Sequence, residues 1–265
     1  MKNEKCFKNK DIYFMEIVAD KIVVNDNYGG VMILDSEFNV VQKIKLIDGL
    51  MIYSSFVKDD EIILYCYENQ CLININVSTY KYHIIYLDKT FDDIIFLPLY
   101  EWKDNGLMLL ADDGKVVVSV NLLSNNVRIM QTDTLEDYEY VICDEWRKLR
   151  NYQVYKIYPD KHSAVIKSEG VLVLMDYKDN TQSVLKMDNI EFHDIEALST
   201  NYIAQISERE ISLLYDNQQI MLYPGDMQNC FLRAKFIEID NIINLIILSS
   251  NSDSTQSKIT KCYCT

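Results

Sequence analysis

Short apolar runs separated by polar turns recur along the whole chain. The runs are five to nine residues long and rich in Ile, Val, Tyr and Leu, and Asn, Asp, Gly and Ser separate them. This is the pattern of short β-strands joined by turns. The phrase "KDDEIILYCYE" at 58–68 has near-copies that begin at Lys103 and Ser199. The pattern therefore predicts an all-β chain built from a repeated unit.

The spacing of the repeat predicts the size of that unit. Apolar runs that follow a turn rich in Asp or Asn begin 40 to 56 residues apart, near Lys21, Glu61, Gly106, His162, Tyr202 and Ile242. A period near 40 residues with about four strands per unit is typical of a β-propeller. The second and third runs of most units are nearly continuous hydrophobics, as expected for inner strands that are covered on both faces. The fourth runs are more polar, and we predict that they are the outermost strands.

The chain resembles the β-propeller superfamily over nearly its whole length. It contains no Gly-His…Trp-Asp pattern, no kelch double glycine and no Ser-x-Asp-x-Gly-x-x-Trp box, so the resemblance names no subfamily. It implies a single domain over residues 1–265 with six blades, and five or seven blades are the alternatives. The sixth unit shows only three strands before the sequence ends. We therefore predict that "EKCFKN" at 4–9 supplies its outer strand and fastens the two ends of the chain together.

The longest spacing, between the third and fourth units, indicates an insertion at 134–151. Thr134 and Asp137 resemble a capping box. Apolar residues then recur at three- and four-residue steps, as on one face of a helix: Leu135, Tyr138, Ile142, Trp146 and Leu149. The sequence predicts a short helical insertion near 134–150. A strand at "YEYVIC", residues 138–143, is the alternative.

Amino-acid composition limits the class of protein and the cellular compartment that we expect. With 49% hydrophobic residues in 265, the chain can bury a sizeable core. No apolar run approaches the roughly 20 residues of a membrane span. Charged residues interrupt every apolar run near the N-terminus, so we expect no secretory leader. The seven cysteines are odd in number and scattered, and we interpret them as buried, reduced thiols. Together these features predict a cytoplasmic protein with no membrane partner.

Motifs for catalysis are weak in this sequence. It has no Gly-x-Ser-x-Gly elbow and no glycine-rich phosphate loop after a strand. "NYGGVM" at 27–32 predicts a hairpin turn in which glycine supplies a positive φ. Only one histidine, His193, lies among carboxylates (Asp188, Glu191 and Asp194), where it is a candidate general acid or metal ligand. A polar loop residue is the simpler interpretation, and we predict no catalytic residue, no cofactor and no metal site.

Charge indicates the kind of partner. A net charge of −14 disfavours nucleic acid and leaves a cationic protein as the candidate. In a propeller, the loops between the second and third strands share one face with the loops that join consecutive blades. On that face we count 15 acidic residues against Lys89 and Arg209, whereas the opposite face has 10 acids against five lysines. The asymmetry predicts an electronegative docking surface, with ordinary solvated loop rims as the alternative.

The predicted partner-binding residues are acids and aromatics of those loops and of the insertion. They are Tyr28, Glu68, Phe91, Asp92, Asp93, Asp112, Asp113, Glu136, Asp137, Trp146, Asp188, Glu191, Glu208 and Glu210. Carboxylates would steer a cationic partner towards this face, and aromatic side chains would anchor it.

In its general properties the chain resembles the cytosolic immunity proteins that neutralise secreted bacterial toxins. It is acidic, of middle size, without a catalytic signature, and rich in Ile, Asn, Lys and Tyr. The resemblance implies a cognate, basic, nuclease-type toxin domain as the partner, inhibited because carboxylates block its active site. Two alternatives remain: a propeller enzyme that acts on a glycan or a small molecule at the central funnel, and a scaffold that binds peptides through its ring edges.

Overall fold

The chain is a β-propeller of six blades, as the sequence predicts. The computed structural model describes residues 3–87, 96–111, 116–131, 148–149, 152–158, 161–185, 192–199, 202–216, 218–225, 229–251, 253 and 255–264. Within these ranges, 24 strands form six four-stranded sheets, and each sheet is one blade. Neighbouring strands run antiparallel, as β3 and β4 do in the first blade.

Four of the blades are built from four strands that follow one another directly. The first and second contain β2 (Met15–Val18), β3 (Lys21–Asn25), β4 (Gly30–Leu34) and β5 (Val40–Lys45), then β6 (Ile52–Lys58), β7 (Glu61–Cys66), β8 (Cys71–Asn76) and β9 (Tyr82–Tyr86). The third and fourth contain β10 (Phe96–Lys103), β11 (Gly106–Ala111), β12 (Val116–Asn121) and β13 (Asn126–Gln131), then β14 (Gln153–Tyr158), β15 (Ser163–Ser168), β16 (Val171–Asp176) and β17 (Thr181–Val184).

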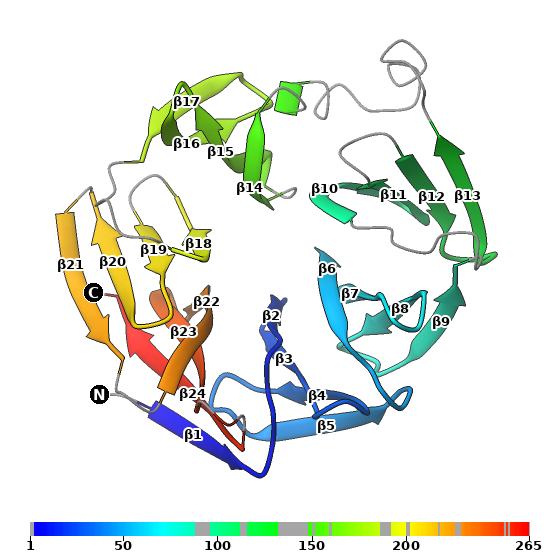
Figure 1. The fold of residues 1–265 in the computed structure, drawn as a ribbon, viewed down its shortest axis with the longest axis horizontal. Coiled ribbons are helices and arrows are strands. Elements are labelled where there is room, and N and C mark those ends of the chain that lie inside the picture. Colours follow the sequence, from blue (N-terminus) through cyan, green and yellow to red (C-terminus); the bar gives the residue numbers. More distant parts are fainter. Residues whose placement is uncertain are drawn as a thin grey trace. The chain divides into compact units, whose positions relative to one another are not determined.

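The last two blades complete the fold and join the chain ends. The fifth contains β18 (Asp194–Ala197), β19 (Tyr202–Ile206), β20 (Glu210–Tyr215) and β21 (Gln218–Pro224). The sixth contains β22 (Asn229–Ile239), β23 (Ile242–Asn251), β24 (Gln256–Tyr263) and, as its outermost strand, β1 (Asn3–Lys8). Figure 1 shows β1 beside β24, and the two strands pair from Asn3 with Lys261 to Lys8 with Gln256. The prediction that the N-terminal segment supplies this strand is confirmed.

Burial explains the hydrophobic pattern of each unit. In the first blade, Ile22 to Asn25 of β3 and all of β4 are buried, whereas β5 exposes four of its six residues. Neighbouring strands and blades cover the middle strands on both faces, so these strands are continuously apolar. The outermost strand has one face in water, so most of its residues are exposed.

The repeated Asp/Asn turns have a backbone cause. A residue with positive φ lies in the turn between the first and second strands of five blades: Ala19, Asp59, Asp104, His162 and Asp240. Three of the five are Asp, which tolerates this left-handed conformation better than most other non-glycine residues, whereas Ala19 and His162 adopt it without that preference. The left-handed turn therefore recurs with the period of the blade, and Asp fills it in three of the five blades.

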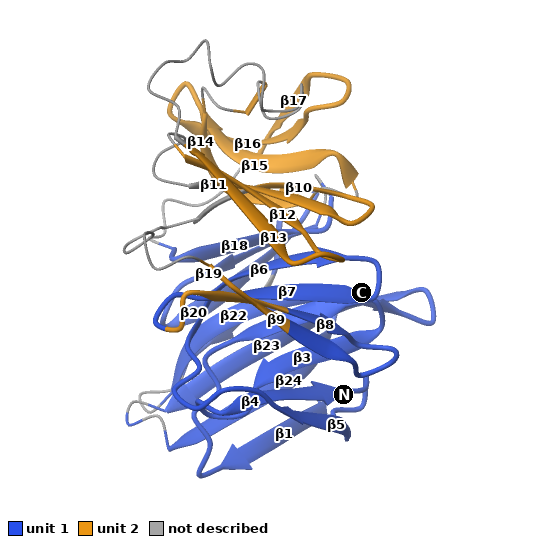
Figure 2. Cartoon of the chain, turned by 90° about the vertical axis from the view of Figure 1, so that its right-hand side faces the viewer, with its two compact units in different colours: residues 1–68, 74–83, 187–265 blue, residues 69–73, 84–186 orange. Residues whose placement is uncertain are grey.

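The chain divides into two compact units, coloured in Figure 2. Unit 1 comprises residues 1–68, 74–83 and 187–265, and unit 2 comprises residues 69–73 and 84–186. In unit 1, one core cluster gathers Phe7, Ile12 and Ile259 with other buried residues of the first and sixth blades. In unit 2, Leu149 and Tyr177 belong to a core cluster formed largely by the fourth blade.

The turn at "NYGGVM" forms as predicted, but glycine has a different role in it. Asn27 has the positive φ, 53°, and neither of the two glycines does. Gly30 is required by space instead, because a Cβ there would lie 2.1 Å from the Ile44 carbonyl oxygen. The turn closes with a 2.8 Å hydrogen bond from the Asp26 N–H to the Gly30 carbonyl.

Most of the predicted insertion, 134–150, lies outside the described residues, so its helix is not shown. Two of its residues are described. Leu149 is fully buried in unit 2, and Lys148 Nζ donates to the Tyr177 carbonyl oxygen at 2.5 Å.

The six described cysteines are thiols rather than members of disulfides. Four of them, Cys66, Cys71, Cys262 and Cys264, are buried, while Cys230 is partly buried and Cys6 is exposed. Cys143 lies outside the described residues. The interpretation of most cysteines as small buried hydrophobes is confirmed for this part of the chain.

Candidate protein-binding surface

In unit 1, loops from different blades meet at one end of the strands. The Asn9 N–H donates to the Thr255 carbonyl at 2.8 Å, and the Leu50 N–H donates to the Tyr28 carbonyl at 2.8 Å. Each bond joins a loop between blades to a loop between second and third strands. The two kinds of loop therefore share one face, as the topology predicts. We call the described loop residues 9–14, 26–29, 46–51, 67–68, 207–209, 253 and 255 the loop face of unit 1.

Two pairs of tyrosines lie at this face. The ring centroids of Tyr13 and Tyr28 are 5.7 Å apart and stacked, and those of Tyr53 and Tyr67 are 5.3 Å apart. Tyr53 is 55% exposed, Tyr28 43% and the neighbouring Met51 39%, so water covers much apolar surface here. We call Tyr13, Tyr28, Met51, Tyr53 and Tyr67 the tyrosine surface.

Hydrogen bonds hold Tyr13 at the centre of the tyrosine surface. Its hydroxyl donates to the Leu50 carbonyl at 3.0 Å and accepts from the Ile52 N–H at 3.1 Å. The hydroxyl of Tyr28 donates to the carboxylate of Asp11. The Tyr13 hydroxyl thus holds the backbone at Leu50 and Ile52, directly before Tyr53 of the second pair.

A buried amide fixes the loop that carries Tyr13. Asn25 is fully buried, and its Oδ1 accepts the backbone N–H groups of Tyr13 and Phe14, each at 2.9 Å. Its Nδ2 donates to the carbonyls of Asp11 and Asn27 at 2.8 and 2.9 Å. All four bonds of this carboxamide are therefore used to join residues 11–14 to the turn at 26–29. A surface ordered in advance loses less conformational entropy when it binds.

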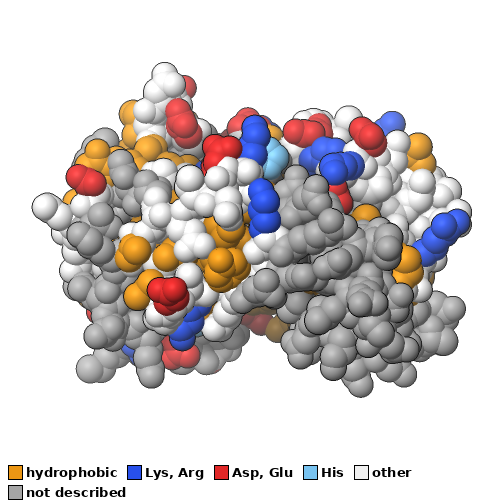
Figure 3. Space-filling view, turned by 90° about the horizontal axis from the view of Figure 1, so that it is seen from above, with side chains coloured by type: hydrophobic (Ala, Val, Ile, Leu, Met, Phe, Trp, Pro, Cys, Tyr) orange, Lys and Arg blue, Asp and Glu red, His pale blue; other side chains and the backbone are white. Residues whose placement is uncertain are grey.

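Carboxylates surround the tyrosine surface, but cations neutralise some of them. The loop face of unit 1 carries six acids, Asp11, Asp26, Asp48, Glu68, Glu208 and Asp253, against Lys10 and Arg209. Lys10 pairs with Asp26, and Arg233 lies 3.3 Å from Asp194, the first residue of β18 and one of the 15 acids counted from the sequence. The count from sequence omitted these two cations, so it overstated the local excess of acid. On the flank seen in Figure 3, acidic and basic side chains lie interspersed among the described residues.

The structure describes four of the 14 predicted partner-binding residues. Tyr28 belongs to the tyrosine surface, and Glu68 directly follows Tyr67. On another blade, Glu208 is exposed in the turn before β20, and Glu210, the first residue of β20, is partly buried. The other ten lie outside the described residues: Phe91, Asp92, Asp93, Asp112, Asp113, Glu136, Asp137, Trp146, Asp188 and Glu191.

Sequence reasoning missed Asp11, Tyr13, Met51 and Tyr53. Asp11 and Tyr13 could have been found from the sequence. If residues 4–9 form the outer strand of the last blade, then residues 9–14 form a loop between two blades and lie on the loop face. The signal for Tyr53 was weaker, because strand alternation alone does not say which residues at a strand end remain exposed.

His193 is held as a loop residue. It is exposed, its backbone N–H donates to the Ile206 carbonyl at 2.9 Å, and its Nε2 lies 3.2 Å from the Leu232 carbonyl. Of the carboxylates that flank it in sequence, Asp194 pairs with Arg233 instead. Within the described part of the chain, no group of three His, Cys, Asp or Glu side chains could hold a metal ion.

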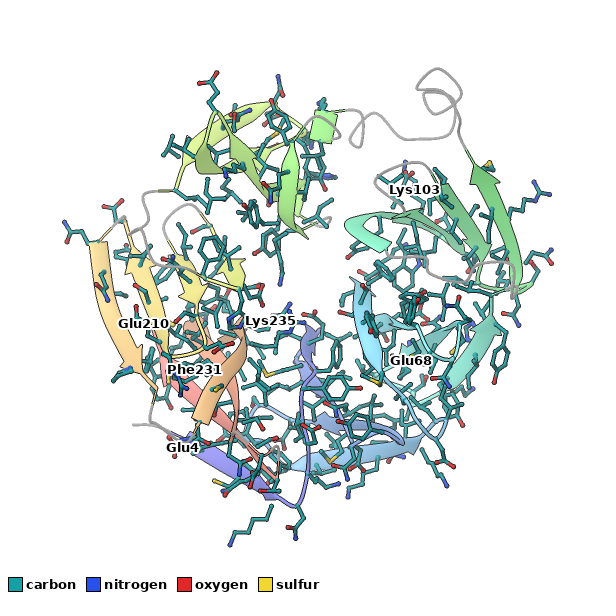
Figure 4. All side chains as sticks on the ribbon, viewed as in Figure 1. Glu4, Glu68, Lys103, Glu210, Phe231 and Lys235 are labelled. Carbon is teal, nitrogen blue, oxygen red and sulfur yellow. The ribbon has the colours of Figure 1, made fainter. Side chains whose placement is uncertain are left out.

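A buried charged cluster joins the innermost strands of three blades. Lys235 of β22, labelled in Figure 4, lies 2.6 Å from Glu16 of β2 and 3.8 Å from Glu196 of β18. The side chains are only 8%, 16% and 10% exposed. Ser55 of β6 donates to the second Glu16 oxygen at 3.1 Å. One ammonium thus binds two carboxylates from neighbouring blades, as expected of a structural brace.

Tyr13 provides a spectroscopic test of the tyrosine surface. Burial raises its pKa to about 12. The pKa of a tyrosine in the unfolded chain is about 10, lower than that of folded Tyr13. The stability that the neutral phenol contributes is therefore fully present below about pH 10 and is lost as the pH rises through about 12. We expect the phenolate absorbance of the native protein to show a step near pH 12 that Tyr13→Phe removes. In denaturant the step should move to about pH 10; a wild-type curve identical to that of the variant would contradict the contact.

Comparison with known proteins supports the fold. No family model and no curated protein matches the chain. The β-propeller domain of Cps50 (Swd1) from Myceliophteria thermophila matches with a TM-score of 0.57 at 9% identity, over 97% of this chain and 98% of that one. Virginiamycin B lyase from Staphylococcus aureus matches with 0.59 at 7% identity, over 99% and 100%. Likeness at such low identity shows the architecture alone.

The described residues include no helix of the length and hydrophobicity that crossing a bilayer requires.

Proposed function

We propose that this chain is a non-catalytic, protein-binding propeller, and that its tyrosine surface binds a basic partner protein. The observation that carries the proposal is the exposed, hydrogen-bonded aromatic group on the loop face of unit 1. Tyrosine is enriched among residues that dominate binding energy, and a ring with few free torsions loses little entropy when it is covered.

Charge supports a basic partner. The chain carries a net −14, and the loop face of unit 1 has three times as many acids as bases among its described residues. An excess of negative charge around apolar anchors raises the association rate of a cationic protein and repels nucleic acid. The tyrosine faces also attract Arg and Lys side chains through cation–π contacts.

The specific form of the proposal is an immunity protein. The partner would be a cognate, basic, nuclease-type bacterial toxin, whose active site binds phosphates and therefore accepts carboxylates. The loop face would cover that site, with Glu68 and its neighbouring acids at phosphate positions and the tyrosines packed around them. Inhibition would then require no chemistry from the propeller itself.

Calorimetry with a purified basic toxin domain encoded beside the gene tests this form. We expect nanomolar binding that weakens steeply between low and high salt, because exposed charges are screened. Loss of nuclease activity at one equivalent of propeller is the functional readout. No binding to any such neighbouring domain would remove the immunity interpretation.

Matched tyrosine variants locate the surface. Tyr53→Ala should weaken the complex by about 2 kcal/mol or more, roughly 30-fold, because it truncates an exposed aromatic anchor. Tyr82 and Tyr86, which are 45% and 65% exposed on the outermost strand β9, serve as controls. Their alanine variants should change the affinity less than twofold, and equal effects at all three sites would reject the assigned surface.

A further inference from the structure

A small pocket lies between the fifth and sixth blades, within unit 1. It has a volume of about 160 Å³ and is lined by ten residues from the end of β21 and from β22, β23, β24 and β1. Phe231 and Glu4, both labelled in Figure 4, come from the first and last strands of the sixth blade. The tyrosine surface contributes no residue to the pocket.

The pocket has an apolar wall and a charged rim. Tyr223 and Ile247 are buried, and Phe231 is partly buried. At the rim, Lys258 Nζ lies 3.8 Å from the Glu4 carboxylate, and these side chains are 32% and 41% exposed. That separation exceeds hydrogen-bond distance, so the ammonium and the carboxylate both keep their hydrogen-bonding capacity for another group.

Thr260 adds a polar group to the pocket. It lines the pocket and is only 7% exposed. Its hydroxyl can donate one hydrogen bond and accept others, so it offers a ligand in the pocket a further polar contact.

We propose that this pocket binds a free α-amino acid. The two rim charges are close enough together to meet both charged groups of one zwitterion: Lys258 binds the α-carboxylate and Glu4 the α-ammonium. The side chain then enters between Phe231, Tyr223 and Ile247. A cavity of about 150 Å³ holds a benzene-sized group, so side chains up to a phenyl ring fit, whereas nucleotides and sugar chains do not.

Calorimetry with L-phenylalanine, L-leucine and two half-molecules tests the chemistry. Phenethylamine lacks the carboxylate and 3-phenylpropionate lacks the ammonium. We expect at least one of the two amino acids to bind and each half-molecule to bind at least tenfold more weakly than L-phenylalanine. No binding of either amino acid at millimolar concentration, or equal binding of a half-molecule, would overturn the proposal.

Variants of the rim test the location. Lys258→Met and Glu4→Gln should each weaken amino-acid binding at least tenfold, and Thr260→Val should weaken it measurably with little change in shape. Lys43→Met and Glu238→Gln, exposed positions on β5 and β22, are the controls and should leave binding unchanged. Unchanged affinity in both rim variants, with cooperative thermal unfolding retained, would reject the site. This result is independent of protein binding by the tyrosine surface.

Discussion

Replacing Lys235 by alanine is expected to lower the free energy of unfolding by about 3–5 kcal/mol. The change leaves Glu16 and Glu196 buried without the ammonium that compensates them, and removal of one partner from a buried ion pair has a cost of this size. Urea denaturation monitored by fluorescence measures the change. The slope of the transition should stay constant if the variant keeps the same compact native state.

Two comparisons distinguish the loss of charge compensation in the cluster from a general loss of stability caused by the substitution. Lys21→Ala removes a pair with Asp20, whose side chain is 81% exposed, and should change stability by less than about 1 kcal/mol. Lys235→Met combined with Glu16→Gln and Glu196→Gln should be clearly more stable than Lys235→Met alone, since an uncharged cluster needs no compensation. If Lys235→Met alone is as stable as the wild type, the cluster is not a brace.

The sequence predicts the strands well because the cause of the pattern is local. The runs predicted at Lys21, Glu61, Gly106, Tyr202 and Ile242 coincide with the first residues of β3, β7, β11, β19 and β23. Four of these strands, β3, β7, β11 and β23, follow a turn that contains a left-handed residue. The strands β3, β7, β19 and β23 are themselves largely buried. Turn chemistry and burial act over a few residues, so a single sequence displays them.

The charged cluster and the tyrosine surface depend on contacts between residues far apart in the chain, which no short stretch of sequence displays. Lys235 meets Glu16 only because the sixth blade lies beside the first, although the residues are far apart in the chain. Likewise, Tyr13 stacks on Tyr28 because the side chain of Asn25 joins their two loops through hydrogen bonds. The hydrogen-bond partners of one buried asparagine cannot be deduced from the spacing of residues along the sequence. The topology predicts which loops share a face, but the pairing of Lys10 with Asp26 requires coordinates.

The strand that joins the chain ends gives the second large expected effect. Phe7 of β1 is 6% exposed and packs in a core cluster with Ile12 and Ile259. Phe7→Ala should therefore lower the free energy of unfolding by about 3–5 kcal/mol, the usual range for a buried phenylalanine. Lys8→Ala, an exposed position on the same strand, is the control and should stay within about 0.5 kcal/mol.

The position of Phe7 makes its effect larger than one lost contact. β1 covers the hydrogen-bonding edge of β24 from Lys261 to Gln256, and Lys5 Nζ donates to the Phe38 carbonyl of the first blade at 2.7 Å. Weakening β1 therefore loosens the sixth blade and its link to the first, and it uncovers an unpaired strand edge that other chains can bind. Phe7→Ala should accordingly form concentration-dependent oligomers in size-exclusion chromatography below its unfolding midpoint, whereas Lys235→Ala, which leaves β1 in place, should unfold as a monomer.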